Sequence, residues 1–196
     1  MPPRILQIYR EPLKAGSERA YDAIETDTAR ISATLGCPHP YLGVESLTGP
    51  KEVWWFNGYE SEADQKQVYV AYAANAPLLA ALQQSSERKA SLTLPHIEAF
   101  TSYREDLSTG PRWTPGQGRF LVITTTTRDE GTTGTVFEAP DGIRFIITSF
   151  QTRENADAAK ALAGGEANVF AVRPAWSFAA EEWIASDPLF WQPQGR

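Results

Sequence analysis

Two hydrophobic periods alternate along the first half of the chain and predict the order of its elements. Strand-like alternation of apolar and polar residues occupies 4–12, 41–47, 53–60 and 96–105. Between the first and second segments, apolar residues recur every three or four positions, which is typical of an amphipathic helix. Between the third and fourth segments, Ser61 and Asp64 indicate the start of a second helix. The resulting order, β-α-β-β-α-β, predicts a ferredoxin-like unit with an antiparallel sheet and both helices on one face.

Capping residues set the expected limits of these helices. Ser17 is the predicted N-cap of the first helix, and Gly36 is its predicted end. Ser61 is the predicted N-cap of the second helix. The segment 75–77, Asn-Ala-Pro, interrupts that helix because proline cannot continue the backbone hydrogen-bond ladder, and a further helical piece is expected over 77–89.

The second half of the chain repeats this pattern incompletely. Residues 109–118 are rich in Gly and Pro and are predicted to form a linker. A strand, a hairpin, a helix and a last strand are then expected at 119–127, 134–151, 154–164 and 169–178, before a short helical and aromatic tail. No helix is expected after the first of these strands, because 128–134 is short and rich in Gly and Thr. The sequence therefore predicts an α+β protein of two ferredoxin-like βαββαβ modules, 1–108 and 119–196, the second degenerate and lacking its first helix.

Trp54 and Trp55 are consecutive in a predicted strand, so their side chains point to opposite faces of the sheet. Both can be buried only if a second layer covers the face that carries no helices. The second module, or a second subunit in a homodimer, is expected to supply that layer. The sheets are therefore expected to pack into an α/β barrel.

The two faces of the first sheet differ in polarity. One face is mostly apolar and is expected under the helices: Leu6, Ile8, Leu42, Val44, Trp54, Phe56, Ile97 and Ala99. The other mixes aromatic and polar groups and is expected to line the interior: Gln7, Tyr9, Tyr41, Glu45, Trp55, Asn57, Tyr59, Glu98, Phe100 and Arg104. A few polar groups among aromatic walls are typical of a small-molecule site. We therefore assign Trp55 to a ligand-facing interior and Trp54 to the helix side.

Composition narrows the possible partners and location. The formal charge is −6 and no Lys/Arg cluster occurs, which argues against nucleic acid or an anionic membrane as a partner. The longest nearly apolar run, 68–82, contains Asn75 and Pro77 and is shorter than the roughly 20 residues of a membrane helix. No signal peptide is expected. The single cysteine, Cys37, excludes an internal disulfide and fits a reducing compartment, so a soluble, cytoplasmic protein is expected.

Candidate acid–base groups are few. The two histidines, His39 and His96, are possible general bases, and the alternative for each is a loop-end side chain bonded to backbone or solvent. Glu45 and Glu98 are a possible acid–base pair, and the alternative is that they pair with an arginine, of which Arg104 is an obvious candidate, or face water. No His/Cys/acid cluster has the spacing of metal ligands, and no histidine follows residue 96 to ligate a haem in the second module. Neither a metal nor another cofactor is therefore predicted.

The order of elements, together with QIYREPLKAG and VWWFNGYESEAD, resembles the dimeric α/β-barrel superfamily, in particular its NIPSNAP-like and antibiotic-biosynthesis-monooxygenase-like branches. The resemblance covers 4–105 and extends loosely over the second half. It implies two sheets enclosing a barrel, by dimerisation or by internal duplication. Some members of the superfamily are cofactor-free monooxygenases of aromatic polyketides that often use Trp, Asn, Tyr and Arg in the cavity, and Trp55, Asn57, Tyr59 and Arg104 are of these types.

These observations lead to a candidate site and two functional hypotheses. Residues expected to hold a small-molecule substrate are Tyr9, Tyr41, Trp55, Asn57 and Glu98. In the enzyme hypothesis, a cofactor-independent monooxygenase acts on a small aromatic or enolisable compound: Tyr59 and Arg104 stabilise developing negative charge and His96 moves a proton. The alternative is a non-catalytic ligand-binding or interaction protein of the same fold, in which this face is a sheet–sheet interface with satisfied polar groups.

Overall fold

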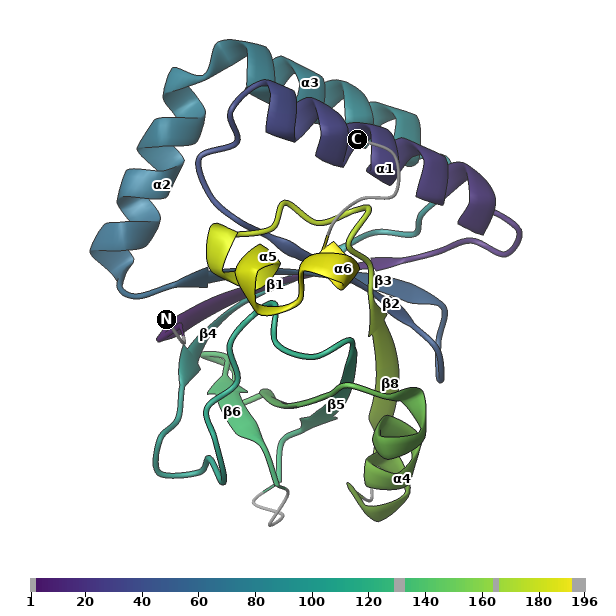
Figure 1. Ribbon diagram of the computed structural model, residues 1–196, viewed down its shortest axis with the longest axis vertical. Coiled ribbons are helices and arrows are strands. Elements are labelled where there is room, and N and C mark those ends of the chain that lie inside the picture. The colour runs from purple at the N-terminus through teal and green to yellow at the C-terminus, as the bar shows by residue number, and fades with distance from the viewer. Residues whose placement is uncertain (1–2, 129–132, 164–165, 192–196) are drawn as a thin grey trace.

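The computed structural model describes residues 3–128, 133–163 and 166–191 (Figure 1). The strands are β1 (Ile5–Pro12), β2 (Leu42–Ser46), β3 (Glu52–Tyr59), β4 (Ile97–Tyr103), β5 (Phe120–Thr126), β6 (Thr135–Glu138), β7 (Arg144–Phe150) and β8 (Ala167–Val172). The helices are α1 (Glu18–Thr34), α2 (Glu62–Ala74), α3 (Ala76–Lys89), α4 (Arg153–Ala163), α5 (Glu181–Ser186) and α6 (Pro188–Trp191). In this part of the chain, no helix has both the length and the hydropathy needed to cross a membrane.

All strands join in one closed antiparallel barrel with the order β1-β3-β2-β8-β5-β7-β6-β4. Two seams connect the halves of the chain. At one seam β2 pairs with β8, with Val44 opposite Val172, and at the other β4 pairs with β6, with Tyr103 opposite Phe137. The predicted fold class is therefore confirmed, and the barrel closes within a single chain without strands from a second subunit. The predicted module limits, 1–108 and 119–196, stay a prediction.

Helices α1 and α3 lie side by side over the outer face of the first half of the barrel (Figure 1). Ser17 occupies the N-cap position of α1, as predicted, but its side chain makes no capping bond, because its hydroxyl donates to the Lys14 carbonyl at 2.6 Å. Ser61 caps α2 as predicted, accepting from the Asp64 backbone N–H at 3.1 Å. The break between α2 and α3 is stabilised by Asn75, whose side chain accepts from the Leu78 N–H and donates to the Leu35 carbonyl.

In the second half, helix α4 lies against the outer face of β5 and β8. Between β5 and β6, the described residues 127–128 and 133–134 contain no helix, in agreement with the predicted degenerate module. The last strand differs from the expected 169–178. It begins earlier because Ala167 and Asn168 pair with Thr124 and Ile123 of β5. It ends at Val172 because the chain turns over residues 173–177, which include Pro174.

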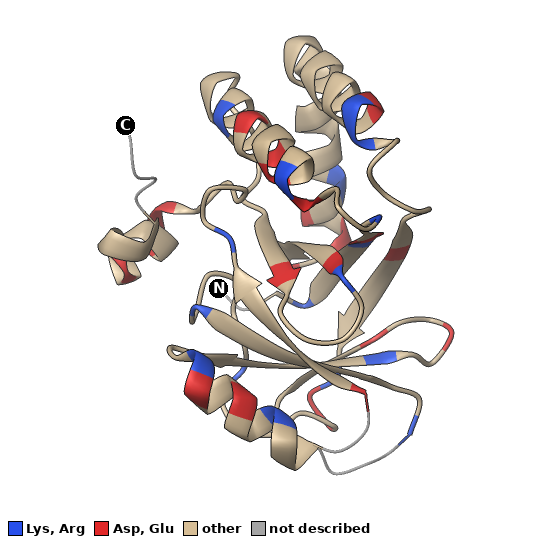
Figure 2. Cartoon of the chain, turned by 90° about the vertical axis from the view of Figure 1, so that its right-hand side faces the viewer, with Lys and Arg blue, Asp and Glu red and all other residues tan. Residues whose placement is uncertain are grey.

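The division of the first sheet into two faces is correct, but their assignment is reversed. Leu6, Ile8 and Trp54 belong to the cluster inside the barrel, whereas Trp55 packs with Leu13, Tyr21 and Trp176 under the helices. The physical reason is that a closed barrel of this size must be filled by apolar side chains. The helices, by contrast, bring charged partners that satisfy polar groups on the outer face. Charged residues accordingly gather on helices and loops more than along the strands (Figure 2).

The barrel is closed at one end by aromatic side chains from outside the sheet. Trp113, Trp183 and Trp191 are each at most 6% exposed and pack against the interior cluster. Trp113 contacts Phe56 edge to face at 5.6 Å between ring centroids. Gly116 makes room for Trp183, because its φ is +86° and a Cβ there would lie 2.3 Å from the indole. The segment 109–118 and the C-terminal helices therefore form a plug at this end.

Candidate ligand-binding site at the barrel mouth

A cavity of about 490 Å³ opens at the other end of the barrel, where β1 ends and β3 begins. This volume lies in the range typical of small-molecule pockets, which often occupy barrel mouths. Trp54, Ile123 and Phe170 supply apolar walls continuous with the barrel core. The polar groups come from β1, β3, β5, β8 and α4, so residues distant in sequence converge on the same opening.

Arg10 and Glu52 form an ion pair at this mouth. The Glu52 side chain is 10% exposed and accepts from Arg10 Nε at 3.3 Å and from Arg10 Nη2 at 3.0–3.1 Å. Trp54 Nε1 donates to the same carboxylate at 2.6 Å, and the Arg10 guanidinium lies 4.5 Å from the Trp54 ring centroid. The backbone N–H of Glu52 donates to Ser46 Oγ, which fixes the start of β3. The guanidinium is thus held by two of its nitrogens, which bond the Glu52 carboxylate, and by stacking on the Trp54 indole. The Ser46 bond in turn fixes the strand end that carries Glu52.

Several donors at the mouth have no acceptor among the residues that the structure describes. Arg10 Nη1 and Lys160 Nζ have no hydrogen-bond or ion-pair partner within the described ranges. Asn168 uses its Oδ1 to accept from Thr48 Oγ1 at 3.3 Å, and Thr48 in turn accepts from the Val169 backbone N–H at 2.9 Å. The Asn168 amide nitrogen has no partner in the same part of the structure. The mouth therefore offers positioned donors beside an apolar floor.

The predicted substrate-binding residues lie on the outer face of the barrel and not in this mouth. Trp55 is 9% exposed and donates from Nε1 to Glu11 at 2.8 Å. Tyr9 stacks on the exposed His96 with 4.5 Å between ring centroids, and Tyr41 contacts Trp55 edge to face. These residues come together as expected. They form a packed layer beneath and beside the helices, so their predicted position in the barrel interior is wrong.

The remaining outer-face residues form a second group. Tyr59 donates to Gln7 Oε1 at 3.1 Å, and Gln7 donates to Glu98 at 2.5 Å. Asn57 lies between Trp55 and Tyr59 in β3 and shares their face. Tyr59 also stacks on His39 with ring centroids 4.8 Å apart. Burial lowers the pKa of His39, so the imidazole is neutral at pH 7.

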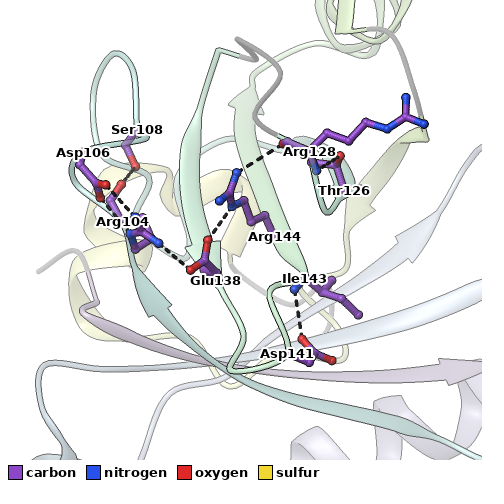
Figure 3. Close-up of polar contacts among 9 residues, drawn as sticks. All are labelled: Arg104, Asp106, Ser108, Thr126, Arg128, Glu138, Asp141, Ile143 and Arg144. Atoms are coloured by element: carbon purple, nitrogen blue, oxygen red, sulfur yellow. Dashed lines mark hydrogen bonds and ion pairs between the residues drawn. The ribbon is translucent and has the colours of Figure 1, made fainter.

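Arg104 belongs to a separate ionic network with Asp106, Glu138 and Arg144 (Figure 3). It bonds Glu138 at 2.5 Å and Asp106 at 2.7 Å, and Glu138 also accepts from Arg144. The hydrogen bond from Arg144 and the charges of both arginines hold the pKa of Glu138 below its ordinary value.

The choice of Arg104 as the partner of Glu45 or Glu98 is therefore wrong, although Glu45 does pair with an arginine. Glu45 pairs instead with Lys51 at 2.6 Å and with Arg173 at 3.4 Å. Glu98 accepts from Gln7, as described above. The catalytic roles proposed for His96, Tyr59 and Arg104 stay predictions, and none of the three residues lines the mouth.

A buried ionic cluster under the helices escaped sequence reasoning. Glu11 accepts from Tyr21 and Trp55 and contacts Lys89 at 3.2 Å, whereas Glu25 contacts Lys89 at 2.5 Å. Burial raises the pKa of Glu25, because the charged carboxylate loses its hydration; Lys89 opposes this effect, and the negative charge of Glu11 adds to it. Burial opposes the charge of Lys89, but the two carboxylates outweigh it and raise its pKa. The cluster supports the Trp55 side of the sheet.

The sequence does mark Arg10 and Glu52, but assigning the apolar face to the helices hid their position at the end of the barrel core. Arg10 continues the apolar alternation of Leu6 and Ile8, and Glu52 continues that of Trp54 and Phe56. Two opposite charges that extend the apolar faces of paired strands indicate a polar group at the end of a core. No three His, Cys, Asp or Glu side chains within the described residues are grouped as metal ligands would be.

No protein-family model and no curated protein matches this sequence. Solved structures with a similar fold include a protein from Fusobacterium nucleatum subsp. nucleatum ATCC 25586 named "Putative monooxygenase", with 9% identity and a TM-score of 0.53, covering 86% of this chain and 91% of that one. A "putative monooxygenase" from Lactobacillus acidophilus NCFM has 9% identity and a TM-score of 0.48, covering 97% of this chain and 89% of that one. An uncharacterised NIPSNAP-like domain protein from Burkholderia xenovorans has 17% identity and a TM-score of 0.40, covering 57% and 95%.

The first of these similarities is one of fold. It supports the predicted α/β-barrel fold, and in this protein the barrel closes within one chain. At 9% identity it transfers no residue role to this chain.

Proposed function

We propose that this chain is a small-molecule-binding α/β-barrel protein whose ligand lies in the open barrel mouth. The observation that carries the proposal is the Arg10–Glu52–Trp54 arrangement. It immobilises a guanidinium at the edge of an apolar cavity while leaving part of its donor capacity unused. A purely structural ion pair would not need an adjoining cavity of about 490 Å³.

A titration with labelled protein tests this proposal. Backbone amide signals are followed by NMR during addition of a panel of small aromatic and enolisable compounds. We expect shifts at Thr48, Thr125 and Asn168. Thr125→Phe fills the mouth and should abolish the shifts, whereas Ser102→Phe, at an exposed outer-face position of β4, should preserve them. Shifts that survive Thr125→Phe, or that occur only under the helices, would contradict a site in the mouth.

The reaction proposed for this mouth is a cofactor-independent oxygenation of a small aromatic or enolisable compound. Arg10 supports it, because a fixed guanidinium stabilises the negative oxygen of an enolate. A CH₂ group beside a carbonyl would lose a proton, and the enolate would react with O₂. The carbon would become a second carbonyl, and the other oxygen atom would leave as water. The structural neighbour named as a monooxygenase shares the barrel fold with this chain.

Oxygen uptake separates this reaction from non-catalytic binding by the same fold. With 1,3-cyclohexanedione as the probe, uptake by the wild type and its loss in Thr125→Phe would support oxygenation. Binding of the probe without uptake would support the non-catalytic alternative.

A homodimer is a further proposal, and native mass spectrometry of the purified protein measures the subunit count together with any retained small molecule.

A further inference from the structure

We propose that the ligand class of the barrel mouth is a singly charged carboxylate with an apolar body. Its acid group would bond Arg10 and Asn168, and its apolar part would pack on the walls formed by Trp54, Ile123 and Phe170. This inference rests on the proposed function, because it specifies what the same mouth accepts.

The guanidinium of Arg10 keeps one edge available to a ligand. Arg10 presents Nε and Nη2 to Glu52, so this edge of the planar group is occupied. The remaining donors are on Nη1 and on the second hydrogen of Nη2, which form the adjoining edge of the fork. A carboxylate matches that edge with two parallel hydrogen bonds. Stacking on Trp54 and the bond from Trp54 to Glu52 keep the guanidinium from turning away.

The amide of Asn168 supplies a second donor. Its oxygen is committed to Thr48, so the NH₂ group is left as a donor among the cavity-lining residues. Close packing against Gly49 limits its rotation, since a Cβ on Gly49 would lie 2.2 Å from Asn168 Oδ1. Because the amide nitrogen is held in one orientation, a ligand that supplies an acceptor can bond it with little reorganisation of the site.

Charge balance selects the class of anion. The ionisable side chains that line the mouth are Arg10, Lys160, Glu52 and Glu166, and their formal charges sum to zero. A monoanion adds one negative charge, opposed by the uncommitted ammonium of Lys160 at the rim. A phosphate monoester would add nearly two in the same space, against the repulsion of both glutamates. The mouth therefore favours carboxylate over phosphate.

Matched probes test the inference. Affinities of benzoate, benzamide and phenyl phosphate are measured at pH 7 by NMR titration of the full chain. We expect benzoate to bind roughly tenfold or more tightly than benzamide, since hydrogen bonds to a charged group are the stronger ones. Asn168→Asp keeps the acceptor for Thr48 but replaces the donor with a negative oxygen, so it should remove this preference. Asn155→Asp makes the same change at an exposed position of α4 and should retain it.

The outcomes separate the two proposals. Equal affinity for benzoate and benzamide, or a preference that survives Asn168→Asp, would overturn the carboxylate class while leaving a ligand site in place. Tighter binding of phenyl phosphate would overturn it in favour of phosphate. Failure of all three probes to bind the mouth would count against the proposed function itself. If Asn168→Asp does not fold, the double variant Arg10→Gln with Glu52→Gln replaces the ion pair with a neutral one and should remove the preference in the same way.

Discussion

Trp54 and Trp55 are neighbours in β3, yet their indole N–H groups donate to different buried carboxylates on opposite sides of the sheet. Trp54 donates to Glu52 at 2.6 Å inside the barrel mouth, and Trp55 donates to Glu11 at 2.8 Å beneath the helices. Each indole therefore anchors one layer of the protein. The Trp54 layer contains the cavity, and the Trp55 layer contains the ionic cluster that supports the helices.

Trp55→Phe should destabilise the fold without changing ligand binding. The substitution leaves the aromatic packing largely in place but removes one of the donors to the buried carboxylate of Glu11. We expect the free energy of unfolding to fall by about 1–3 kcal/mol. Urea denaturation measures the loss, and a titration with benzoate checks that affinity is retained. If the variant is fully folded and still binds benzoate more weakly than the wild type, Trp55 belongs to the ligand site.

Trp54→Phe should weaken ligand binding. It removes the donor to Glu52 and the larger ring under Arg10, so the guanidinium loses two of the contacts that orient it. We expect affinity to fall by about 1 kcal/mol, roughly fivefold. NMR titration of the variant with benzoate measures the change. Unaltered affinity in a folded Trp54→Phe protein would mean that the stacked guanidinium is not part of the site.

The order of elements along the first half of the chain and the two faces of its sheet were predictable because they depend on local periodicity. Periodicity did not predict which of the two faces points into the barrel and which lies under the helices. Polarity suggested that the mixed face of Tyr9, Trp55 and Tyr59 would line a cavity, but Glu25 and Lys89 of α1 and α3 bring charges toward that same face. The partners that decide the matter come from helices whose rotation about their axes the sequence leaves open.

Stability should depend on pH through Glu25. Its pKa in the folded state is raised from 4.5 by burial, so above pH 4.5 the unfolded chain releases a proton that the folded chain retains. The contribution of Glu25 to stability therefore falls as pH rises from about 4.5 to the folded-state pKa, by about 1.4 kcal/mol for each unit between the two values.

Glu25→Gln is the matched variant for this dependence. The stability of the wild type relative to Glu25→Gln, measured by urea denaturation from pH 4.5 to 8, should decline with rising pH. A difference that is flat, or that rises with pH, would mean that the Glu25 carboxyl is ionised throughout and is fully stabilised by Lys89.

The plug at the closed end should be a large contributor to stability. Trp183 is 6% exposed and packs with Trp191 at 5.4 Å between ring centroids, whereas its neighbour Ile184 is 38% exposed. Trp183→Ala should lower the free energy of unfolding by about 3–5 kcal/mol, the usual cost of truncating a buried aromatic residue. Ile184→Ala is the control in the same short helix and should cost much less. Similar losses in the two variants would contradict a buried plug.

The site itself was beyond local pattern because its parts are brought together only by barrel closure. Arg10 and Glu52 lie on neighbouring strands of the first half, so their proximity could be inferred once β1 and β3 were paired. Asn168 and Lys160 join them through the seam between β2 and β8, which links residues more than a hundred positions apart. The aromatic plug likewise depends on the path of segments with no regular period.

The most direct measurement follows the indole N–H signals of ¹⁵N-labelled tryptophan while benzoate is added, with Trp54→Phe and Trp55→Phe used to assign the two resonances. A ligand in the mouth must alter the field around the indole that carries Arg10 and donates to Glu52. The expected result is a saturable shift of the Trp54 signal with the Trp55 signal unmoved. Movement of Trp55 while Trp54 stays fixed would place the ligand under the helices and contradict the mouth as the binding site.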